Sequence, residues 1–398
     1  MSTAPWVREL VNVLGRSSID RCIGLHEPYL RETDIERSVI ECIRSGWLST
    51  AGSEIDEFEQ SIADFTGARS VVAVTNGTNA LRLALQAIGV KAGDEVLVPA
   101  LSFVASANAV AHIGGIPNFV DVEASSLGVN PEKLNRYLEK TCTRDNGETV
   151  NTKSGRSIKA LIATHVLGHP CKINELIKVS NRWGIHVIED AAEALGSFTS
   201  TNESKVHCGL SGSVGVLSFN GNKIITTGGG GAVLTNNMEL GNQIRHVSRT
   251  AKVPHPWLFS HDRVGYNDRM PNINACIGNS QMQSLKKIIS LKERVYELYD
   301  RFFEDNDGMD LFKPQAGVTW NYWLNCIFIK DGKNNLKVRN EILDALNKSG
   351  IQARPLWNVL NGLRMYKLNP SDNCNDAENL VTRGICLPSS AFIGESWK

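Results

Sequence analysis

Short apolar runs rich in β-branched residues alternate with helix-period segments through the first half of this 398-residue chain, and this alternation constrains the fold more than any other feature. The runs are VVAV (71–74), EVLVPA (95–100), IPNFVDV (116–122), KALIATHV (159–166) and IHVIED (185–190). Nearly continuous apolar strands are typical of a sheet covered by helices on both faces. The alternation predicts an α/β domain with a mainly parallel sheet.

The pattern changes after about residue 275, where long helix-like stretches begin and a shorter mixture of strand and helix signals closes the chain. A change of this kind is typical of a second, smaller domain. We therefore expect a large domain over residues 20–275 and a smaller C-terminal α+β domain over residues 276–398, with residues 1–19 as a candidate addition to the smaller one.

Composition and charge exclude several classes of function. Hydrophobic residues make up 42% of the chain, as in globular proteins with a sizeable core. Lys+Arg and Asp+Glu balance at 42 each, and no basic segment carries interleaved aromatics, so no nucleic-acid partner is expected. The nine cysteines include no CxxC pair, which argues against a metal site and favours reduced thiols. The amino terminus lacks the apolar segment of a signal peptide, and no run approaches the roughly 18 apolar residues of a membrane span, so we expect a cytoplasmic protein without a membrane partner.

A strand-to-helix turn at Asn76-Gly77-Thr78 offers a place for an anion. Backbone N–H groups are exposed at such a turn, and the helix dipole favours negative charge there. Thr78 is also a candidate N-cap and Gly77 an ordinary turn residue, which are the commoner roles. Neither a GxGxxG fingerprint nor a GxxxxGK[ST] loop occurs, so dinucleotide and P-loop sites are disfavoured.

Two carboxylates, Glu189 and Asp190, stand at the end of an apolar strand, where ligands gather in open α/β sheets. A carboxylate at that place can keep a cationic nitrogen protonated through charge and a hydrogen bond. Asp190 could equally cap a helix over the following AAEAL, with Glu193 three positions later completing a capping box. The residues alone do not separate these two interpretations.

Lys223 lies shortly after the apolar run VGVLSF and before four glycines, Gly228 to Gly231. A buried lysine loses its proton more easily than an exposed one, and a neutral amine can form a Schiff base with an aldehyde. Ser218, at the end of the apolar run, could bind a phosphate oxygen, and the glycines would let the backbone pass close to a flat ligand. A solvated loop lysine is the commoner alternative.

These signals are weak one by one but fit one cofactor together. Pyridoxal 5′-phosphate needs a phosphate cradle, a carboxylate for its pyridine nitrogen and an amine for its aldehyde. Phe103, in VPALSFVASANAV, stands at a strand end where an aromatic ring could pack on the cofactor, although a plain core phenylalanine is the more frequent case.

Five ordered blocks resemble motifs of the DegT/DnrJ/EryC1/StrS family of pyridoxal-phosphate sugar aminotransferases: NGTNALRLAL, GDEVLVPALSFVASANAV, EDAAEALGS, LSFNGNKIITTGGGGAVLTNN and GYNDRMPNINACIG. The resemblance covers nearly the whole chain. It implies the aspartate aminotransferase architecture, fold type I, with a mainly parallel seven-stranded sheet in the large domain and a smaller α+β domain. It also implies a homodimer with shared active sites.

The resemblance assigns roles to the matching positions. Lys223 would form the Schiff base and move a proton between the sugar carbon and the cofactor carbon, Asp190 would pair with the pyridinium nitrogen, and Phe103 would lie against the ring. The phosphate would be held by Gly77, Thr78 and Ser218.

Three positions in or near these motifs bear on the dimer and on departures from the family pattern. Asn267, in GYNDRM, matches the asparagine that reaches the phosphate of a partner subunit. Glu193 stands near the cofactor's 3-hydroxyl, where many members carry glutamine or histidine. Asp268 replaces a frequent tyrosine, which we interpret as a tolerated change.

Within the family, SGWLST, THVLGHP, SFNGNKIITTGGGG, TAKVPHPW and RPLWNVLNGLRMYK are most similar to aminotransferases of bacillosamine and legionaminic acid synthesis. This similarity implies a UDP-4-keto-6-deoxy-N-acetylhexosamine acceptor and glutamate as the amino donor. The nucleotide would reach Trp47, Ser49 and Thr50 of GWLST and also Arg354, which could instead be a helix-end or surface arginine.

Two alternative functions stay open. A pyridoxal-phosphate-dependent sugar dehydratase on the same fold would lack the Schiff-base lysine, so the presence of Lys223 weighs against it. A non-catalytic sugar-binding or regulatory member would keep only the fold, and the joint presence of Lys223, Asp190 and the phosphate residues weighs against that.

Overall fold

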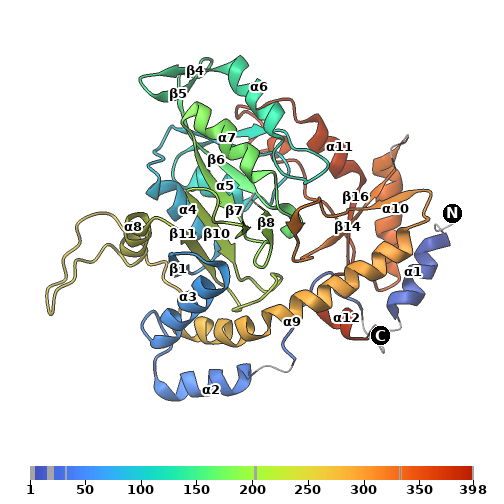
Figure 1. Cartoon of the computed structure of the whole chain (residues 1–398), viewed down its shortest axis with the longest axis horizontal. Helices are drawn as coiled ribbons and strands as arrows, with labels where there is room; N and C mark the ends of the chain where they lie inside the picture. Colours follow the sequence, from blue (N-terminus) through green and yellow to red (C-terminus); the bar gives the residue numbers. More distant parts are fainter. Residues whose placement is uncertain are drawn as a thin grey trace.

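The computed structural model describes residues 5–15, 22–31, 34–200, 204–330, 332 and 334–396. Its centre is a sheet with the strand order β1-β11-β10-β7-β6-β2-β3, and the hairpin β4–β5 adds to β6 (Figure 1). The strands are β1 (Ser70–Val74), β2 (Glu95–Pro99), β3 (Ile116–Val120), β4 (Cys142–Asp145), β5 (Glu148–Asn151), β6 (Ser157–Thr164), β7 (His186–Asp190), β10 (Val214–Ser218) and β11 (Gly231–Thr235). The five strands from β10 to β3 are parallel, and β11 runs antiparallel to both of its neighbours. The predicted mainly parallel sheet of seven strands is confirmed, with the hairpin as an addition.

Helices bury both faces of this sheet. The helices that pack on the sheet or beside it are α3 (Ser53–Thr66), α4 (Gly77–Ala87), α5 (Ala105–His112), α6 (Pro131–Thr141), α7 (Ile173–Trp183) and α8 (Met238–Ser248). Along β2, Val96 and Val98 belong to the large core shared with α4 and α5, whereas Leu97 belongs to the separate core beneath α6 and α7. Successive side chains of a strand point to opposite faces, so a strand covered on both sides must be apolar throughout.

The C-terminal part forms a second sheet with the order β12-β14-β16-β15, lying to the right of the large sheet in Figure 1. Its elements are β12 (Met309–Leu311), β14 (Asn325–Ile329), β15 (Arg354–Pro355), β16 (Gly384–Leu387), α10 (Asn335–Lys348), α11 (Asn375–Arg383) and α12 (Ala391–Ser396). The long helix α9 (Asn272–Phe303) contacts α2 (Ile35–Ser45) and α3 at one end and α12 elsewhere along its length. Helix α9 is continuous across the expected boundary at residue 275, and the division into two domains stays a prediction.

The remaining elements are short or lie at the edges. They are α1 (Pro5–Gly15), β8 (Phe198–Ser200), β9 (Lys205–His207), β13 (Val318–Thr319) and the 3-10 turns η1 (Val166–Gly168) and η2 (Leu360–Gly362). Helix α1 packs against α10, which supports the grouping of residues 5–15 with the smaller part, whereas residues 1–4 and 16–19 lie outside the described residues. None of the helices in the described ranges is long and apolar enough to cross a membrane.

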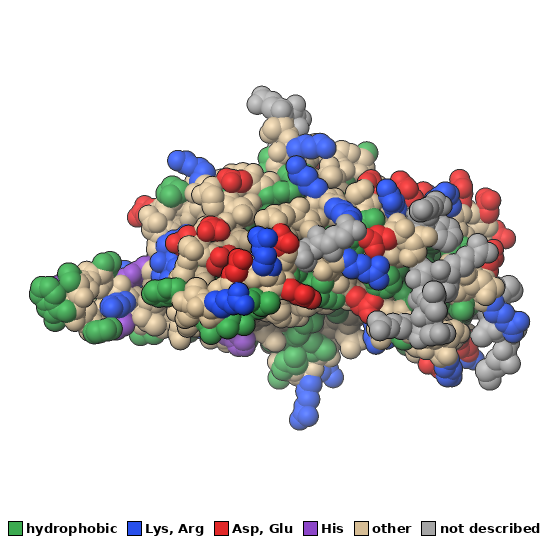
Figure 2. All heavy atoms as spheres, turned by 90° about the horizontal axis from the view of Figure 1, so that it is seen from below, with side chains coloured by type: hydrophobic (Ala, Val, Ile, Leu, Met, Phe, Trp, Pro, Cys, Tyr) green, Lys and Arg blue, Asp and Glu red, His purple; other side chains and the backbone are tan. Residues whose placement is uncertain are grey.

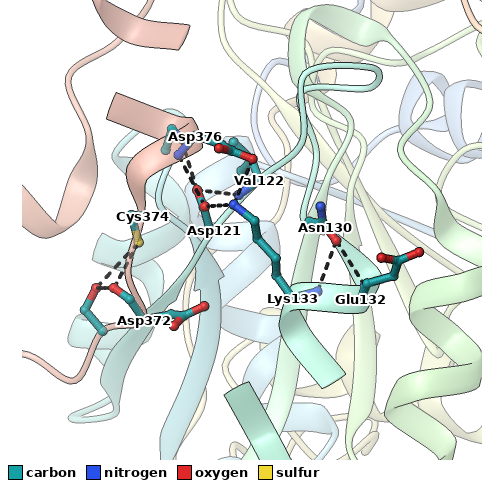
Figure 3. Close-up of polar contacts among 10 residues, drawn as sticks. Asp121, Val122, Asn130, Glu132, Lys133, Asp372, Cys374 and Asp376 are labelled. Carbon is teal, nitrogen blue, oxygen red and sulfur yellow. Dashed lines mark hydrogen bonds and ion pairs between the residues drawn. The ribbon is translucent and has the colours of Figure 1, made fainter. Parts of the chain in front are cut away.

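A buried carboxylate ties the two parts together at the end of β3 (Figure 3). The Asp121 side chain accepts hydrogen bonds from the backbone nitrogens of Val122 at 2.9 Å, Asp376 at 3.3 Å and Ala377 at 3.0 Å. Lys133 forms an ion pair with the same carboxylate. Asp121 thereby satisfies the free N–H groups at the first turn of α11 from a distant element of the large sheet.

Candidate active site

Seven residues predicted from the sequence line one cavity of about 320 Å³: Gly77, Thr78, Phe103, Asp190, Glu193, Ser218 and Lys223. The cavity lies where β7 and β10 end and α4 begins. Parallel strands bring their carboxyl ends to the same edge of a sheet, and the N-terminus of a helix that follows such a strand faces that edge. The structure therefore gathers residues that are far apart in the sequence.

The turn before α4 forms one end of this cavity. Asn76, and not Thr78 as predicted, is the N-cap, because the helix already begins at Gly77 and the Asn76 side chain accepts from the Asn79 backbone nitrogen at 2.8 Å. The Thr78 hydroxyl is thus released from capping. A Cβ on Gly77 would lie 3.0 Å from the Ser218 Cβ and 3.3 Å from its Oγ. Glycine therefore lets the turn and the end of β10 approach each other and leaves room for an anion between their N–H and hydroxyl groups.

Asp190 is buried at the end of β7 and is held in place from two sides. Its Oδ2 accepts from the Ser106 hydroxyl at 2.7 Å, and its Oδ1 accepts from the Ala192 backbone nitrogen at 3.2 Å. The interpretation of Asp190 as a helix cap is wrong, because residues 191–197 form successive turns and no helix follows. Both oxygens keep a free lone pair, so the carboxylate can still bind a cationic ring nitrogen.

Glu189, the neighbour of Asp190, points to the other side of β7. Its carboxylate lies 3.0 Å from Nε2 of the buried His165 and accepts from three backbone nitrogens, those of Gly209, Ser211 and Gly212. This network closes the loop before β10 and does not reach the cavity. Of the two adjacent carboxylates, only Asp190 belongs to the site.

Lys223 is not a solvated loop lysine. Its side chain is 12% exposed, and its Nζ lies 3.3 Å from Oε1 of Glu193 and 4.4 Å from the centre of the Trp323 ring. The aromatic face and the carboxylate together aim the amine into the cavity. Burial raises the pKa of Glu193 to about 7, and the neighbouring Asp190 adds to this rise while Lys223 opposes it. A carboxyl group with such a pKa can exchange a proton near neutral pH.

The interpretation of Gly228 to Gly231 as backbone beside a flat ligand is wrong. None of the four lines the cavity. A Cβ on Gly231 would lie 2.7 Å from the Gly77 nitrogen, and one on Gly230 would lie 2.4 Å from Oγ1 of Thr227. Gly231 therefore allows β11 to pass directly behind the turn that precedes α4, so it supports that end of the site from outside.

A second cavity, of about 590 Å³, continues from the first. The two share Ser102, Phe103, Asn222, Trp323 and Trp357. The second cavity extends to β15, where Arg354 lies, and its lining is otherwise mostly aliphatic and aromatic. The Nη1 of Arg354 donates to Oδ1 of Asn347 at 2.9 Å and to the Ala353 carbonyl at 3.0 Å, which fixes the guanidinium at the rim.

Four predicted residues lie elsewhere. Trp47 lines a separate cavity of about 600 Å³, and the Ser49 carbonyl accepts from the backbone of Asn272 at the start of α9. Neither these two nor Thr50 line the cavity that holds Lys223. Asn267 is exposed and forms an isolated antiparallel β-bridge with Arg249 at the base of a long loop. It does not line the cavity that holds Lys223.

Sequence reasoning missed several residues that line or support the cavity: Asn76, Ser102, Ser106, Thr164, Asn220, Asn222, Trp323 and Trp357. Small hydroxyl and amide residues are common at strand ends, so position alone does not mark these. Trp323 and Trp357 are brought to the cavity by the packing of the second sheet. The sequence alone therefore does not distinguish them from tryptophans of the core.

Residues 30–395 match the DegT/DnrJ/EryC1/StrS aminotransferase family. The chain belongs to this family. It is 34% identical to the GDP-perosamine synthase of Vibrio cholerae over 92% of this chain and 94% of that protein. It is 32% identical to the UDP-2-acetamido-2-deoxy-3-oxo-D-glucuronate aminotransferase of Pseudomonas aeruginosa (strain ATCC 15692 / PAO1) over 63% of each chain. The crystal structure of the aminotransferase TlmJ from Streptoalloteichus hindustanus superposes with a TM-score of 0.82 at 27% identity and covers 92% of this chain and 93% of that one.

The DegT-family chain is therefore a pyridoxal-phosphate-dependent sugar aminotransferase, and its cavity fits that cofactor. The cradle at Gly77 would be filled by any larger side chain, Asp190 offers a buried carboxylate at the end of β7, and the Lys223 amine lines the same cavity. These are the three kinds of group that a phosphate, a pyridine nitrogen and an aldehyde require.

Proposed function

We propose that this enzyme transfers an amino group from glutamate to the C4 ketone of a nucleotide-linked 4-keto-6-deoxy sugar, with UDP-4-keto-6-deoxy-N-acetylglucosamine as the substrate. The observation that carries the proposal is the convergence of Lys223, Asp190 and the Gly77 turn on one cavity that opens into a larger apolar one.

Four side chains of the cavity, those of Lys223, Asp190, Thr78 and Ser218, have roles that their surroundings support. The bound cofactor supplies an aldehyde and an electron-withdrawing ring. Lys223 would provide the amine that holds the cofactor, and its Nζ could carry a proton to and from the reacting carbon. Asp190 keeps the ring nitrogen protonated. Thr78, Ser218 and the N–H groups of the α4 turn hold the phosphate.

The lining of the second cavity supports the proposal that the substrate is a deoxygenated, acetylated sugar. Its lining includes Leu25, Val104, Leu324, Leu356 and Met365, which offer no hydrogen-bond partner to a primary hydroxyl but favour methyl groups. A 6-deoxy carbon and an N-acetyl group each present a methyl group. The named relatives act on different nucleotide sugars, GDP-linked in one case and UDP-linked in the other, so the nucleotide of this enzyme rests on the sequence resemblance.

Product analysis tests the substrate. We expect NMR spectroscopy to show a UDP-4-amino-4,6-dideoxy sugar after incubation of the enzyme with glutamate and UDP-4-keto-6-deoxy-N-acetylglucosamine. Absence of a 4-amino product would overturn the proposed substrate but would leave the assignment to the family unchanged. Release of ammonia without amino transfer would favour the dehydratase, and binding without any turnover of keto sugars would favour the non-catalytic alternative.

Variant Lys223→Ala tests the attachment residue. The wild-type protein should show a visible absorption band and a covalent adduct after borohydride reduction, and the variant should lose both together with turnover. A reducible adduct that persists in the variant would show that another amine holds the cofactor.

The proposal includes a homodimer that shares its active sites. Asn267 lies outside its own cavity at the base of an arm, residues 252–264, that projects far from the body between α8 and α9 (Figure 1). Hydrophobic side chains gather at the end of this arm, which forms the left tip in Figure 2. Among them, Trp257 is 75% exposed and Phe259 is 81% exposed. Such an apolar tip is costly in water and supports insertion into a second copy.

Contacts of the nucleotide with Trp47, Ser49, Thr50 and Arg354 stay predictions, as does a cytoplasmic location. Arg354 is the best supported of the four, because it lines the cavity that continues from the Lys223 site. The other three support a nucleotide subsite only if a partner subunit brings them to the cavity.

A further inference from the structure

Glu193 and Lys223 form a close pair inside the cofactor cavity. The Nζ of Lys223 lies 3.3 Å from Oε1 of Glu193, and both side chains are largely withdrawn from water. An ion pair in such a place loses most of its hydration, so a neutral amine beside a neutral carboxylic acid becomes competitive with the charged pair.

A strained loop orients the carboxyl group. The Leu167 backbone nitrogen donates to Oε2 of Glu193 at 2.9 Å, which leaves Oε1 directed at the lysine. Leu167 has a φ of 58°, a conformation that a leucine rarely adopts, and the Trp320 indole holds it there by donating to its carbonyl at 3.0 Å. Asn321 donates to the Glu193 carbonyl at 2.7 Å. Unusual backbone angles that the surroundings enforce are typical of functional sites.

The titratable groups around Glu193 and Lys223 do not compete for the proton that these two side chains share. Asp190 is the other charged group beside Glu193, and it disfavours a second carboxylate. Further titratable groups on the elements that pack here are His26, His165, His169 and Glu189. Burial lowers the pKa of His26 and of His169, so both are neutral at pH 7, and His165 is engaged with Glu189 on the far side of the sheet.

We propose that Glu193 is the proton partner of Lys223. Whenever the lysine amine is free, an Nζ–H bond breaks and an O–H bond forms on Oε1, and the reverse transfer restores the ion pair. No other reactant is needed, and the net charge of the pair stays zero. The transfer would supply the neutral amine that attachment of the cofactor aldehyde requires, without exposing the site to bulk water. This inference rests on the proposed role of Lys223.

The rate at which the cofactor-free, full-length protein captures pyridoxal phosphate tests the proposal, with the visible absorption as readout. In Glu193→Gln the amine must lose its proton to water. We expect capture at pH 7 to be at least about tenfold slower than in the wild type and to recover as the pH is raised. Glu193→Asp, which keeps a carboxylate, should restore part of the capture rate at pH 7. A merely structural role would slow capture equally at every pH.

A matched control is Glu123→Gln, because Glu123 is also a mostly buried carboxylate paired with a lysine, Lys172 at 2.7 Å, outside both cavities. It should follow the wild-type pH profile. A wild-type profile in Glu193→Gln, or a uniform slowing at every pH, would overturn the proposal. If Lys223→Ala still gives a reducible adduct, the attachment role itself fails, so the two failures are distinguishable.

Discussion

Oδ1 of Asp121 accepts a hydrogen bond at 3.0 Å from the backbone nitrogen of Ala377, which lies 256 positions later in the chain. The bond connects the end of β3 in the large sheet to the start of α11 beside the second sheet (Figure 3). The second cavity is lined from both sides of this junction. Stability of the junction therefore bears on the shape of the second cavity.

Variant Asp121→Ala should lower the free energy of unfolding by about 2–4 kcal/mol, because it leaves the first N–H groups of α11 and the Lys133 ammonium without their buried acceptor. Denaturant titration measures this. Asp376→Asn is the control, since the Asp376 carboxylate is half-exposed and its loss should cost less than about 1 kcal/mol. Equal stabilities of the two variants would contradict the prediction.

Gly231→Ala should destabilise the protein by about 1–3 kcal/mol and weaken cofactor binding, because the new Cβ would meet the backbone of Asn76 and Gly77 at under 3 Å. Gly229→Ala is the matched control within the same run, since a Cβ there meets nothing within 4 Å. Thermal unfolding and cofactor titration distinguish the two variants. If Gly229→Ala weakens cofactor binding more than Gly231→Ala does, the glycines lie beside the ligand after all.

Asp190→Asn should reduce turnover by roughly 100-fold or more, because a buried charge that stabilises a cation cannot be replaced by a neutral amide. Steady-state kinetics with saturating cofactor measure the loss. Ser106→Ala removes only the hydroxyl that donates to Oδ2 of Asp190 and should cost less than about tenfold. A larger loss in Ser106→Ala than in Asp190→Asn would argue that the hydroxyl, not the carboxylate, is the essential group.

Two buried histidines predict a loss of stability in acid. Burial lowers the pKa of His169 and of His207 to about 4, and each ring accepts a backbone N–H, from Gln315 and Gly196 respectively. Between about pH 6.5 and pH 4 the unfolded chain binds these protons and the folded chain does not, so stability falls as the pH is lowered through that window. The free energy of unfolding, measured against pH, should decline less steeply in His169→Gln. An unchanged slope would show that His169 is already protonated in the fold.

Subunit mixing tests the shared site. Lys223→Ala and Asn267→Ala should each be nearly inactive alone, whereas a mixture allowed to exchange subunits should regain up to about a quarter of wild-type activity, because half of the dimers carry one intact site. Mixing Lys223→Ala with Asp190→Asn is the control, because both residues line the cavity of the same chain. In this hybrid each subunit carries one defective residue in its own cavity, so no activity should return. An intact site could form only if Lys223 and Asp190 came from different subunits. Recovery in the control but not in the test pair would contradict the assignment of Asn267 to the partner.

Local patterns were sufficient to predict most of the large sheet and the core of the site. The apolar runs ending at Asp190 and Ser218 are strands because their residues cannot be left in water, and ligands collect where such strands end. Lys223 was predictable only in combination with Asp190 and the Gly77 turn, since a lone lysine is most often solvated. The alternative role of Thr78 as a helix cap is wrong, since Asn76 and Thr78 offer similar capping groups and the choice depends on where the first helical turn starts.

The α/β alternation could thus be predicted from the amino-acid sequence alone, because it follows from hydrophobic periodicity. The cofactor class and the residues at the strand ends could also be predicted, because a phosphate, a pyridine and an aldehyde each need a particular type of side chain. Tertiary packing decided the rest. It turned Glu189 away and Asp190 inward, set Gly231 behind the turn that precedes α4, and brought Trp323 and Glu193 close to the Lys223 amine. Such contacts join segments far apart in the sequence, and their geometry depends on how two sheets and a long helix pack together.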